Sequence, residues 1–194
     1  EEVKKTIYLI HKYNRKIVLM QCNTNYTASE ENFKFINLNA LKTFKKTFKN
    51  KIVLGLSDHT FGSETVLGAI TLGARVIEKH FTDDNSRNGP DHKFSMNPNT
   101  WRQMVASARR LEQSLGDGKK IIEKNERDTA IIQRRSLRAS KKLSKNTVLK
   151  YKHLIALRPC PRNAISPDKI QQVLGKKVLK NMEFHEHFTW KKIR

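Results

Sequence analysis

Cysteine is scarce in this sequence, and the two that occur lie far apart. Cys22 and Cys160 belong to no C-x-x-C pair, so the sequence offers neither a disulfide framework nor a cysteine-based zinc site. It also lacks a secretory signal pattern and any apolar run of about eighteen residues, the length that a membrane helix needs. We therefore expect a cytoplasmic protein with no membrane partner.

Acidic residues are also in short supply. The chain has 39 Lys and Arg against 18 Asp and Glu, a net charge of +21. Residues 1–118 carry 18 basic and 12 acidic side chains, whereas residues 119–194 carry 21 and 6. Such an excess favours polyanionic partners, but no nucleic-acid-binding motif accompanies it. A solvated lysine-rich surface or a small phosphorylated substrate accounts for the charge, and we expect no nucleic-acid partner.

Apolar runs alternate with helical segments over the first 118 residues. The runs begin at Ile17, Ile52 and Val76, and each is typical of a strand buried on both faces. Each run is followed by a polar loop and then by a segment of helical periodicity, at 32–48, 64–72 and 98–115, and a further helix is expected over 1–14. This order predicts an α/β fold with a parallel sheet. Three such units cannot close an eight-stranded barrel, which needs about 250 residues.

The pattern of apolar and charged residues changes after residue 118. A charged link over 119–131 leads into residues 132–194, where short apolar runs are separated by turns. One short helix is expected over 167–174, closed by Gly175. The pattern predicts a second, small and mostly β module.

Two histidines end neighbouring predicted strands, His59 in GLSDHT and His80 in IEKHFT. Because adjacent parallel strands lie about 4.8 Å apart, both imidazoles could reach one pocket. A two-histidine site suits Mn²⁺, Fe²⁺ or Zn²⁺ better than Ca²⁺, although two hydrogen-bonded histidines without a metal fit the spacing as well. Asp58 could support a metal ligand or be a solvated carboxylate at the strand end.

Several other polar residues lie near the predicted strand ends. Glu78 faces the same side as His80, two residues later, so it could orient a substrate or move a proton, or pair with a neighbouring lysine. Ser57 could bind a phosphate oxygen and Tyr26 a sugar, although ordinary loop and core roles fit both. Asp91, in the turn GPDHKFS, and Arg158, in the second module, are also compatible with plain surface positions.

Six segments, taken together, resemble the motifs of the sialic acid synthase family, which includes legionaminic and pseudaminic acid synthases and spore-coat polysaccharide synthases. In order they are QCNTNY, GLSDHT, GARVIEKHFT, GPDHKFSM, LGDGKK and QRRSLRA. The resemblance extends over essentially the whole chain. It implies the last three βα units of a TIM barrel in residues 1–118, a linker, and an antifreeze-like (SAF) domain in 132–194. The first five barrel strands and their phosphate-anchoring lysines would be absent, so the chain alone is expected to be inactive.

The resemblance also implies roles for residues. His59 and His80 would be ligands of a divalent metal, Mn²⁺ foremost, with Mg²⁺ or Co²⁺ as alternatives, and Glu78 would act at the reacting centre. Arg158 would reach the amino-sugar site of the partner in a domain-swapped homodimer. The implied substrate contacts are, as a group, Thr24, Tyr26, Ser57, Asp91 and Arg158.

The activity implied is condensation of phosphoenolpyruvate with an N-acetylmannosamine-type amino sugar, with release of phosphate. The alternative is a non-catalytic remnant, or a module that binds a glycan or protein partner through its SAF domain. Two departures leave the sugar open among N-acetylmannosamine, its 6-phosphate and a di-acetamido sugar. Thr27-Ala28 stand where many relatives continue with proline, and residues 159–164 replace a turn that commonly contains glycine.

Overall fold

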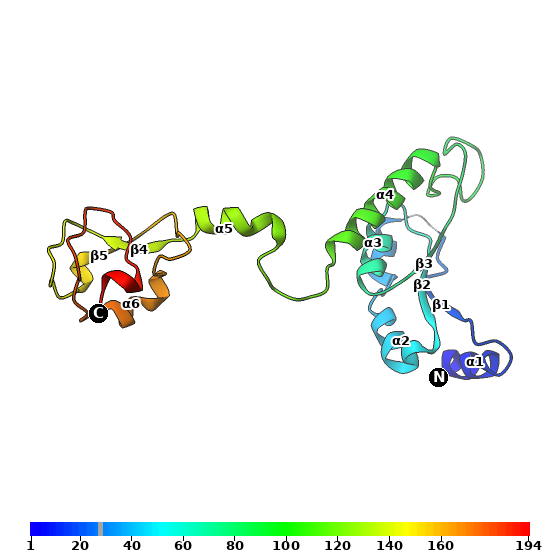
Figure 1. Cartoon of the computed structure of the whole chain (residues 1–194). Helices are drawn as coiled ribbons and strands as arrows, with labels where there is room; N and C mark the ends of the chain where they lie inside the picture. Colours follow the sequence, from blue (N-terminus) through cyan, green and yellow to red (C-terminus); the bar gives the residue numbers. More distant parts are fainter. Residues whose placement is uncertain (27–28) are drawn as a thin grey trace. The chain divides into compact units, whose positions relative to one another are not determined.

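The chain folds as two compact units, residues 1–119 and 120–194 (Figure 1). The structure is a computed structural model that describes residues 1–26 and 29–194, so the departure at Thr27-Ala28 lies outside the described residues. Within those two ranges, no helix has the length and apolar character needed to span a membrane.

The first unit contains a parallel sheet of three strands, β1 (Val18–Cys22), β2 (Val53–Asp58) and β3 (Val76–Lys79), paired in the order β1-β2-β3. Helices α2 (Ala40–Phe48) and α3 (Glu64–Thr71) connect consecutive strands, and α4 (Pro98–Ser114) follows β3. Helix α1 (Glu2–His11) precedes the sheet. The predicted α/β order of three βα units is confirmed.

The helix predicted over 32–48 is wrong as a single element. Glu30–Phe35 forms a 3₁₀ helix, and α2 begins only at Ala40. Between them Asn37 adopts a positive φ of 50°, a conformation that interrupts a right-handed helix and that asparagine tolerates better than most residues. The chain therefore turns before it enters α2.

Helices pack on one face of the sheet. Leu54 and Leu56 of β2 are buried there against Val66 and Ile70 of α3 and Met104 of α4. The opposite face carries the alternate residues, and Val18, Val53 and Val76 are 45%, 43% and 38% exposed. The prediction of strands buried on both faces is therefore wrong for these residues, because only one face is covered by the described part of the chain.

The second unit is built around an antiparallel pair, β4 (Ser136–Ala139) and β5 (Leu154–Leu157). Helix α5 (Arg127–Gln133) precedes β4, so part of the predicted charged link is helical, and α6 (Ile170–Val173) lies within the predicted 167–174 segment. The buried apolar residues are Leu137, Ala139, Leu143, Leu149, Ile165, Val173, Val178, Met182, Phe188 and Ile193. The remaining 3₁₀ helices are Lys49–Lys51, Lys124–Glu126, Tyr151–His153, Pro167–Lys169 and Trp190–Lys192.

Candidate functional site

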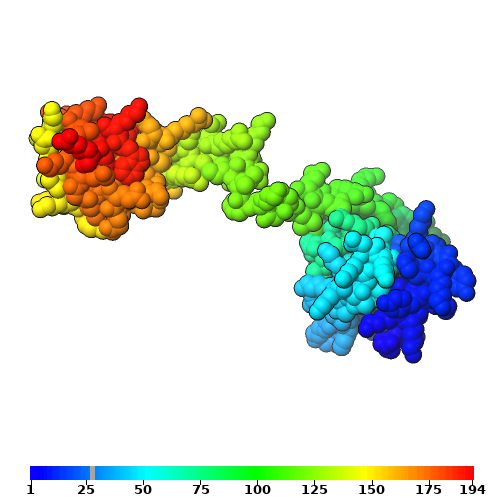
Figure 2. All heavy atoms as spheres, turned by 60° about the horizontal axis from the view of Figure 1, so that its bottom comes forward, coloured from blue at the N-terminus to red at the C-terminus, as the bar shows by residue number. Residues whose placement is uncertain are grey.

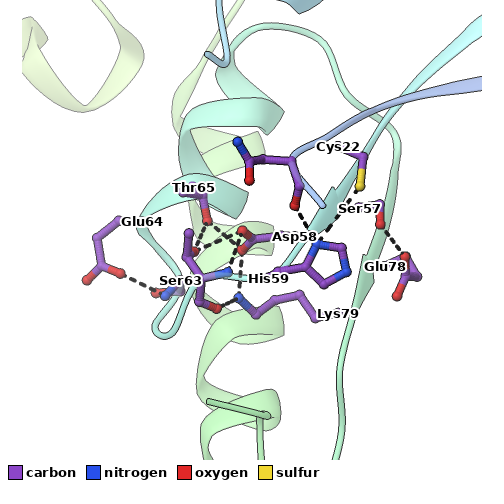
Figure 3. Close-up of polar contacts among 11 residues, drawn as sticks. Cys22, Ser57, Asp58, His59, Ser63, Glu64, Thr65, Glu78 and Lys79 are labelled. Atoms are coloured by element: carbon purple, nitrogen blue, oxygen red, sulfur yellow. Dashed lines mark hydrogen bonds and ion pairs between the residues drawn. The ribbon is translucent and has the colours of Figure 1, made fainter. Parts of the chain in front are cut away.

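The polar residues at the ends of β2 and β3 divide between the two faces of the sheet. Side chains alternate along a strand, and Ser57 pairs in register with Glu78 while Asp58 pairs with Lys79. Asp58 and Lys79 lie on the face that the helices cover. Ser57 and Glu78 lie on the opposite face, the side on which His59 and His80 follow. Figure 3 shows His59, Ser57 and Glu78 apart from the contacts around Asp58.

His59 and His80 come together at this end of the sheet. Their ring centroids are 5.0 Å apart, and the rings meet edge to face at 72°. The Nδ1 atom of His59 lies 2.8 Å from the carbonyl oxygen of Asn23. Because a carbonyl can only accept a hydrogen bond, Nδ1 carries the proton and Nε2 presents its lone pair.

His80 is held in a similar way. Its Nδ1 atom lies 3.3 Å from Oδ2 of Asp91, so the carboxylate faces this edge of the ring and leaves the Nε2 edge free of it. An imidazole whose Nδ1–H is fixed by a carbonyl or a carboxylate is the common form of a metal-binding histidine. Asp91, which the sequence suggested as a sugar contact, is thus placed beside His80.

The two imidazoles fit a divalent transition metal as part of its donor set. In the described ranges there is no group of three or more His, Cys, Asp or Glu side chains arranged to hold an ion. A metal at His59 and His80 would need further ligands besides these two nitrogens, and water or substrate oxygens are suitable ones. This mixed nitrogen and oxygen set suits Mn²⁺ and its neighbours.

Tyr26 lies against both histidines. Its ring centroid is 4.2 Å from that of His59 and 5.5 Å from that of His80, while the side chain remains 49% exposed. It therefore contacts both imidazoles while about half of its surface stays open to a bound molecule. Thr24 is exposed, and its hydroxyl has no hydrogen-bond partner within residues 1–26 and 29–194.

Ser57 and Glu78 form a second pair on the same face. The hydroxyl of Ser57 donates to Oε2 of Glu78 across 2.5 Å, and Glu78 itself is exposed. The sequence left an ion pair between Glu78 and a neighbouring lysine open. That possibility is wrong, because Lys79 lies on the other face, and the hydrogen bond to Ser57 orients the carboxylate instead.

Asp58 belongs to a buried network on the helix side. Its Oδ2 atom lies 2.6 Å from Nζ of Lys79, and the two side chains are 0% and 1% exposed. The hydroxyls of Thr60 and Thr65 donate to the same carboxylate at 2.8 and 2.5 Å, and Lys79 also donates to the carbonyl of Thr60 at 2.6 Å. Both expectations for Asp58 are therefore wrong: it supports no histidine ring and is not solvated. It fixes the loop between β2 and α3 that carries His59.

Sequence reasoning also missed the residue that holds the loop around Asp91. The amide of Asn85 donates to the carbonyls of His92 and Ser95 at 2.7 and 2.8 Å and accepts from the amide of Asn97 at 2.8 Å. Nothing in the spacing of the sequence marks Asn85, because two backbone carbonyls and the Asn97 side chain become its partners only in the folded loop. The contacts set the position of Asp91 relative to His80.

Arg158 belongs to the second unit, where hydrogen bonds hold both its side chain and the backbone that follows it. Its Nε atom donates to the carbonyl of Gln133 at 2.8 Å. The next carbonyl, that of Pro159, accepts from Oγ of Ser136 and Nη2 of Arg138, each at 2.8 Å. We call these last contacts the Pro159 clamp. The clamp fixes the backbone, and the exposed Arg158 guanidinium keeps its two Nη groups for other partners.

A parallel βα sheet with histidines at the carboxyl ends of its strands, followed by a small antiparallel domain, defines a barrel-type unit joined to an SAF-like domain. Comparison with known proteins specifies it further: residues 1–120 match the model of the NeuB family, and residues 134–194 match that of the SAF domain. The chain belongs to the NeuB family, as the six sequence segments predicted.

Individual relatives agree with this assignment. The chain is 36% identical to N,N'-diacetyllegionaminic acid synthase from Campylobacter jejuni over 95% of its own length and 54% of that protein. It is 28% identical to human N-acetylneuraminate-9-phosphate synthase over 94% of its length and 50% of that protein. The chain thus spans about half the length of the curated relatives it matches.

Solved structures agree as well. The N-acetylneuraminic acid synthetase of Leptospira borgpetersenii, solved with citrate, matches with a TM-score of 0.57 at 30% identity, covering 66% of this chain and 43% of that one. A spore coat polysaccharide biosynthesis protein E from Chromobacterium violaceum matches at 18% identity with a TM-score of 0.65, covering 99% and 56%. The second likeness supports the fold alone.

Proposed function

We propose that this chain supplies metal-binding and catalytic residues for the condensation of phosphoenolpyruvate with an N-acetylmannosamine-type amino sugar, giving a nonulosonic acid and phosphate. The observation that carries the proposal is the pair of imidazoles, His59 and His80, each with its Nδ1 against an acceptor, in a unit that belongs to the NeuB family. The relatives' names, which are those of legionaminic, pseudaminic and sialic acid synthases, support the same chemistry.

In this proposal His59 and His80 hold a divalent ion, Mn²⁺ foremost and Mg²⁺ or Co²⁺ as alternatives. When bound, such an ion supplies Lewis acidity toward the aldehyde oxygen of an open-chain amino sugar. Asn23 and Asp91 contact the Nδ1 atoms of the two rings, which leaves both Nε2 atoms available to the ion. The basic surplus of the chain, +21 in all, favours the approach of anionic phosphoenolpyruvate.

The reaction requires one new carbon–carbon bond and one hydrolytic step. C3 of phosphoenolpyruvate bonds to the aldehyde carbon, and a water oxygen adds at C2. The C2–O bond to phosphate then breaks, and of the two protons of the water one goes to the former aldehyde oxygen and the other to the released phosphate. In this proposal Glu78 takes a proton from that water; its carboxylate, exposed and hydrogen-bonded to the hydroxyl of Ser57, supports that role.

The remaining predicted contacts have assigned roles in the same proposal. Ser57 contacts the phosphate of phosphoenolpyruvate, and Thr24 and Tyr26 approach the substrates from the loop after β1. Asp91 shares its carboxylate between His80 and a sugar hydroxyl. Arg158 presents its two Nη groups to the amino sugar of a partner chain in a domain-swapped homodimer. A complete barrel of about 250 residues is needed, so we expect residues 1–118 without the other strands to be inactive.

The test is product formation by this chain placed within a complete barrel. Phosphoenolpyruvate, Mn²⁺ and each of the three candidate sugars (N-acetylmannosamine, its 6-phosphate, a di-acetamido sugar) are incubated, and products are identified by mass spectrometry. We expect a nonulosonic acid from one sugar, its loss on chelation, and no product from the 194-residue chain alone. Absence of product with every sugar, from a folded and metal-loaded protein, would contradict the proposal.

A further inference from the structure

The second unit contains a pocket that has no residue in common with the strand-end site. It holds about 430 Å³ and lies between helix α5 and the turn over residues 160–164. Its lining combines three arginines with an apolar wall: Arg127, Arg134 and Arg162, with Ile122, Ile131 and Pro161. In Figure 2 the yellow-green atoms of the α5 segment adjoin the yellow-orange atoms of this turn.

The arginines reach the pocket from both of its sides. Arg127 and Arg134 are seven residues apart, about two helical turns, so they project from one face of α5 and its end. Arg162 comes from the opposite side, in the segment where the sequence departs from the commoner glycine-containing turn. The N–H of Cys160 donates to the carbonyl of Ile131 at 2.9 Å and ties the two sides together. The Pro159 clamp holds the backbone just before the same turn.

The three guanidinium groups lack partners inside the part of the chain that the structure describes. None donates a side-chain hydrogen bond or lies within 4.0 Å of a carboxylate there, whereas Arg75, Arg87 and Arg109 of the first unit all form ion pairs. Three like charges around one cavity repel each other. A bound anion would relieve that repulsion and give the guanidinium forks the planar oxygen pairs that they match.

We propose that this pocket binds a phosphate monoester carried on a small carbon skeleton, such as a phosphorylated sugar. A phosphate monoester carries about −1.5 to −2 charges at pH 7 and three acceptor oxygens, which suits a pocket lined by three arginines better than a single carboxylate does. The apolar wall would contact the carbon skeleton, and the volume lies within the range of about 300–1,000 Å³ usual for small-molecule pockets. The proposal does not rest on the strand-end chemistry.

The test is a calorimetric titration of the whole chain at constant ionic strength with glucose 6-phosphate, inorganic phosphate and glucose. The variants are Arg134→Gln and Arg162→Gln, and the matched control is Arg135→Gln. Arg135 adjoins Arg134 and is exposed, but it does not line the pocket. The control thus removes the same charge without altering the site.

We expect saturable binding of glucose 6-phosphate, tighter than that of inorganic phosphate, and no binding of glucose. Each pocket variant should weaken binding by about tenfold or more and the control by no more than about twofold, because charge-assisted hydrogen bonds are lost only in the pocket variants. Equal losses in Arg134→Gln and Arg135→Gln would overturn the site in favour of general charge. Absence of saturable binding, or equal binding of inorganic phosphate, would overturn the proposed ligand.

Discussion

His59 and His80 stand edge to face with ring centroids 5.0 Å apart, and each directs its Nδ1 toward a different acceptor. The acceptors come from separate loops, Asn23 after β1 and Asp91 after β3. Each ring is therefore held by a contact at its Nδ1 and by the other ring before any ligand binds. Such preorganisation is what a metal site on strand ends requires.

The first prediction concerns metal affinity. His80→Ala should weaken Mn²⁺ binding to the chain by at least about tenfold, and Asp91→Asn by about tenfold, because the proposed function makes His80 a ligand and Asp91 its support. Electron paramagnetic resonance of free Mn²⁺ measures both. His92→Ala is the control, since His92 contacts Thr82 and takes no part in the imidazole pair. Loss of binding in His92→Ala as well would contradict the assignment.

The second prediction concerns the buried pair of Asp58 and Lys79. Lys79→Met should lower the free energy of unfolding by about 3–5 kcal/mol, because it leaves a buried carboxylate without its cation. Arg87→Met is the control, since its pair with Asp83 is exposed and such pairs contribute about 0.2–1 kcal/mol. Urea unfolding monitored by circular dichroism gives both values. Similar losses in the two variants would show that Asp58 and Lys79 are not a buried pair in solution.

The third prediction concerns acid sensitivity of the second unit. Burial, together with the charges of Lys141 and Lys152, lowers the pKa of His153, which is 8% exposed and accepts the N–H of Lys150 at Nδ1. As the pH falls, His153 is therefore protonated in the unfolded chain before it is protonated in the folded chain. The stability that neutral His153 contributes is full above the unfolded pKa of about 6.5 and is lost as the pH falls toward the folded pKa.

The measurement is the urea midpoint of the second unit's transition between about pH 7.5 and pH 5.5, a window that spans the unfolded pKa. The midpoint should fall on acidification, and His153→Gln should reduce the slope. Burial lowers the pKa of His187 as well, so part of the slope should remain. His185→Gln, at an exposed position, serves as the control. An unchanged slope in His153→Gln would contradict this account.

The fourth prediction concerns the Pro159 clamp. Ser136→Ala removes one of the two hydrogen bonds to the Pro159 carbonyl, from a side chain that is fully buried. Exchange of the Cys160 amide hydrogen should accelerate by about five- to tenfold, because a lost intramolecular hydrogen bond is worth about 1 kcal/mol. Ser140→Ala removes a similar bond, to the carbonyl of Lys152, and should leave Cys160 unaffected. Equal exchange rates in Ser136→Ala and the parent chain would mean that the clamp does not hold the turn.

The sequence was sufficient for the strands and for the side on which the chemistry lies. Runs predicted to begin at Ile17, Ile52 and Val76 form strands from Val18, Val53 and Val76, because apolar β-branched runs have few other stable environments. The alternation of side chains along the strands then brings Ser57 and Glu78 to one face of the sheet. The sequence had predicted that Glu78 and His80 share that face. These features depend on local pattern alone.

Features that depend on register and on backbone partners were beyond that reasoning. The pairing of Asp58 with Lys79 follows from the offset between β2 and β3, which no single strand determines. The interruption at Asn37 reflects a positive φ inside an otherwise helical pattern. Helix α5 was hidden within a charged link because none of its apolar residues belongs to the buried core of the second unit, and Ile132 is 59% exposed.

The central claim is that the strand-end histidines serve a metal-dependent synthase, and the most direct measurement is phosphate release from phosphoenolpyruvate with the preferred amino sugar and Mn²⁺. It compares the parent, His80→Ala and His92→Ala, each with this chain in a complete barrel. The account predicts sugar-dependent release that chelation abolishes, a loss of at least about a hundredfold in His80→Ala, and near-parent release in His92→Ala. Undiminished release in folded His80→Ala would contradict it.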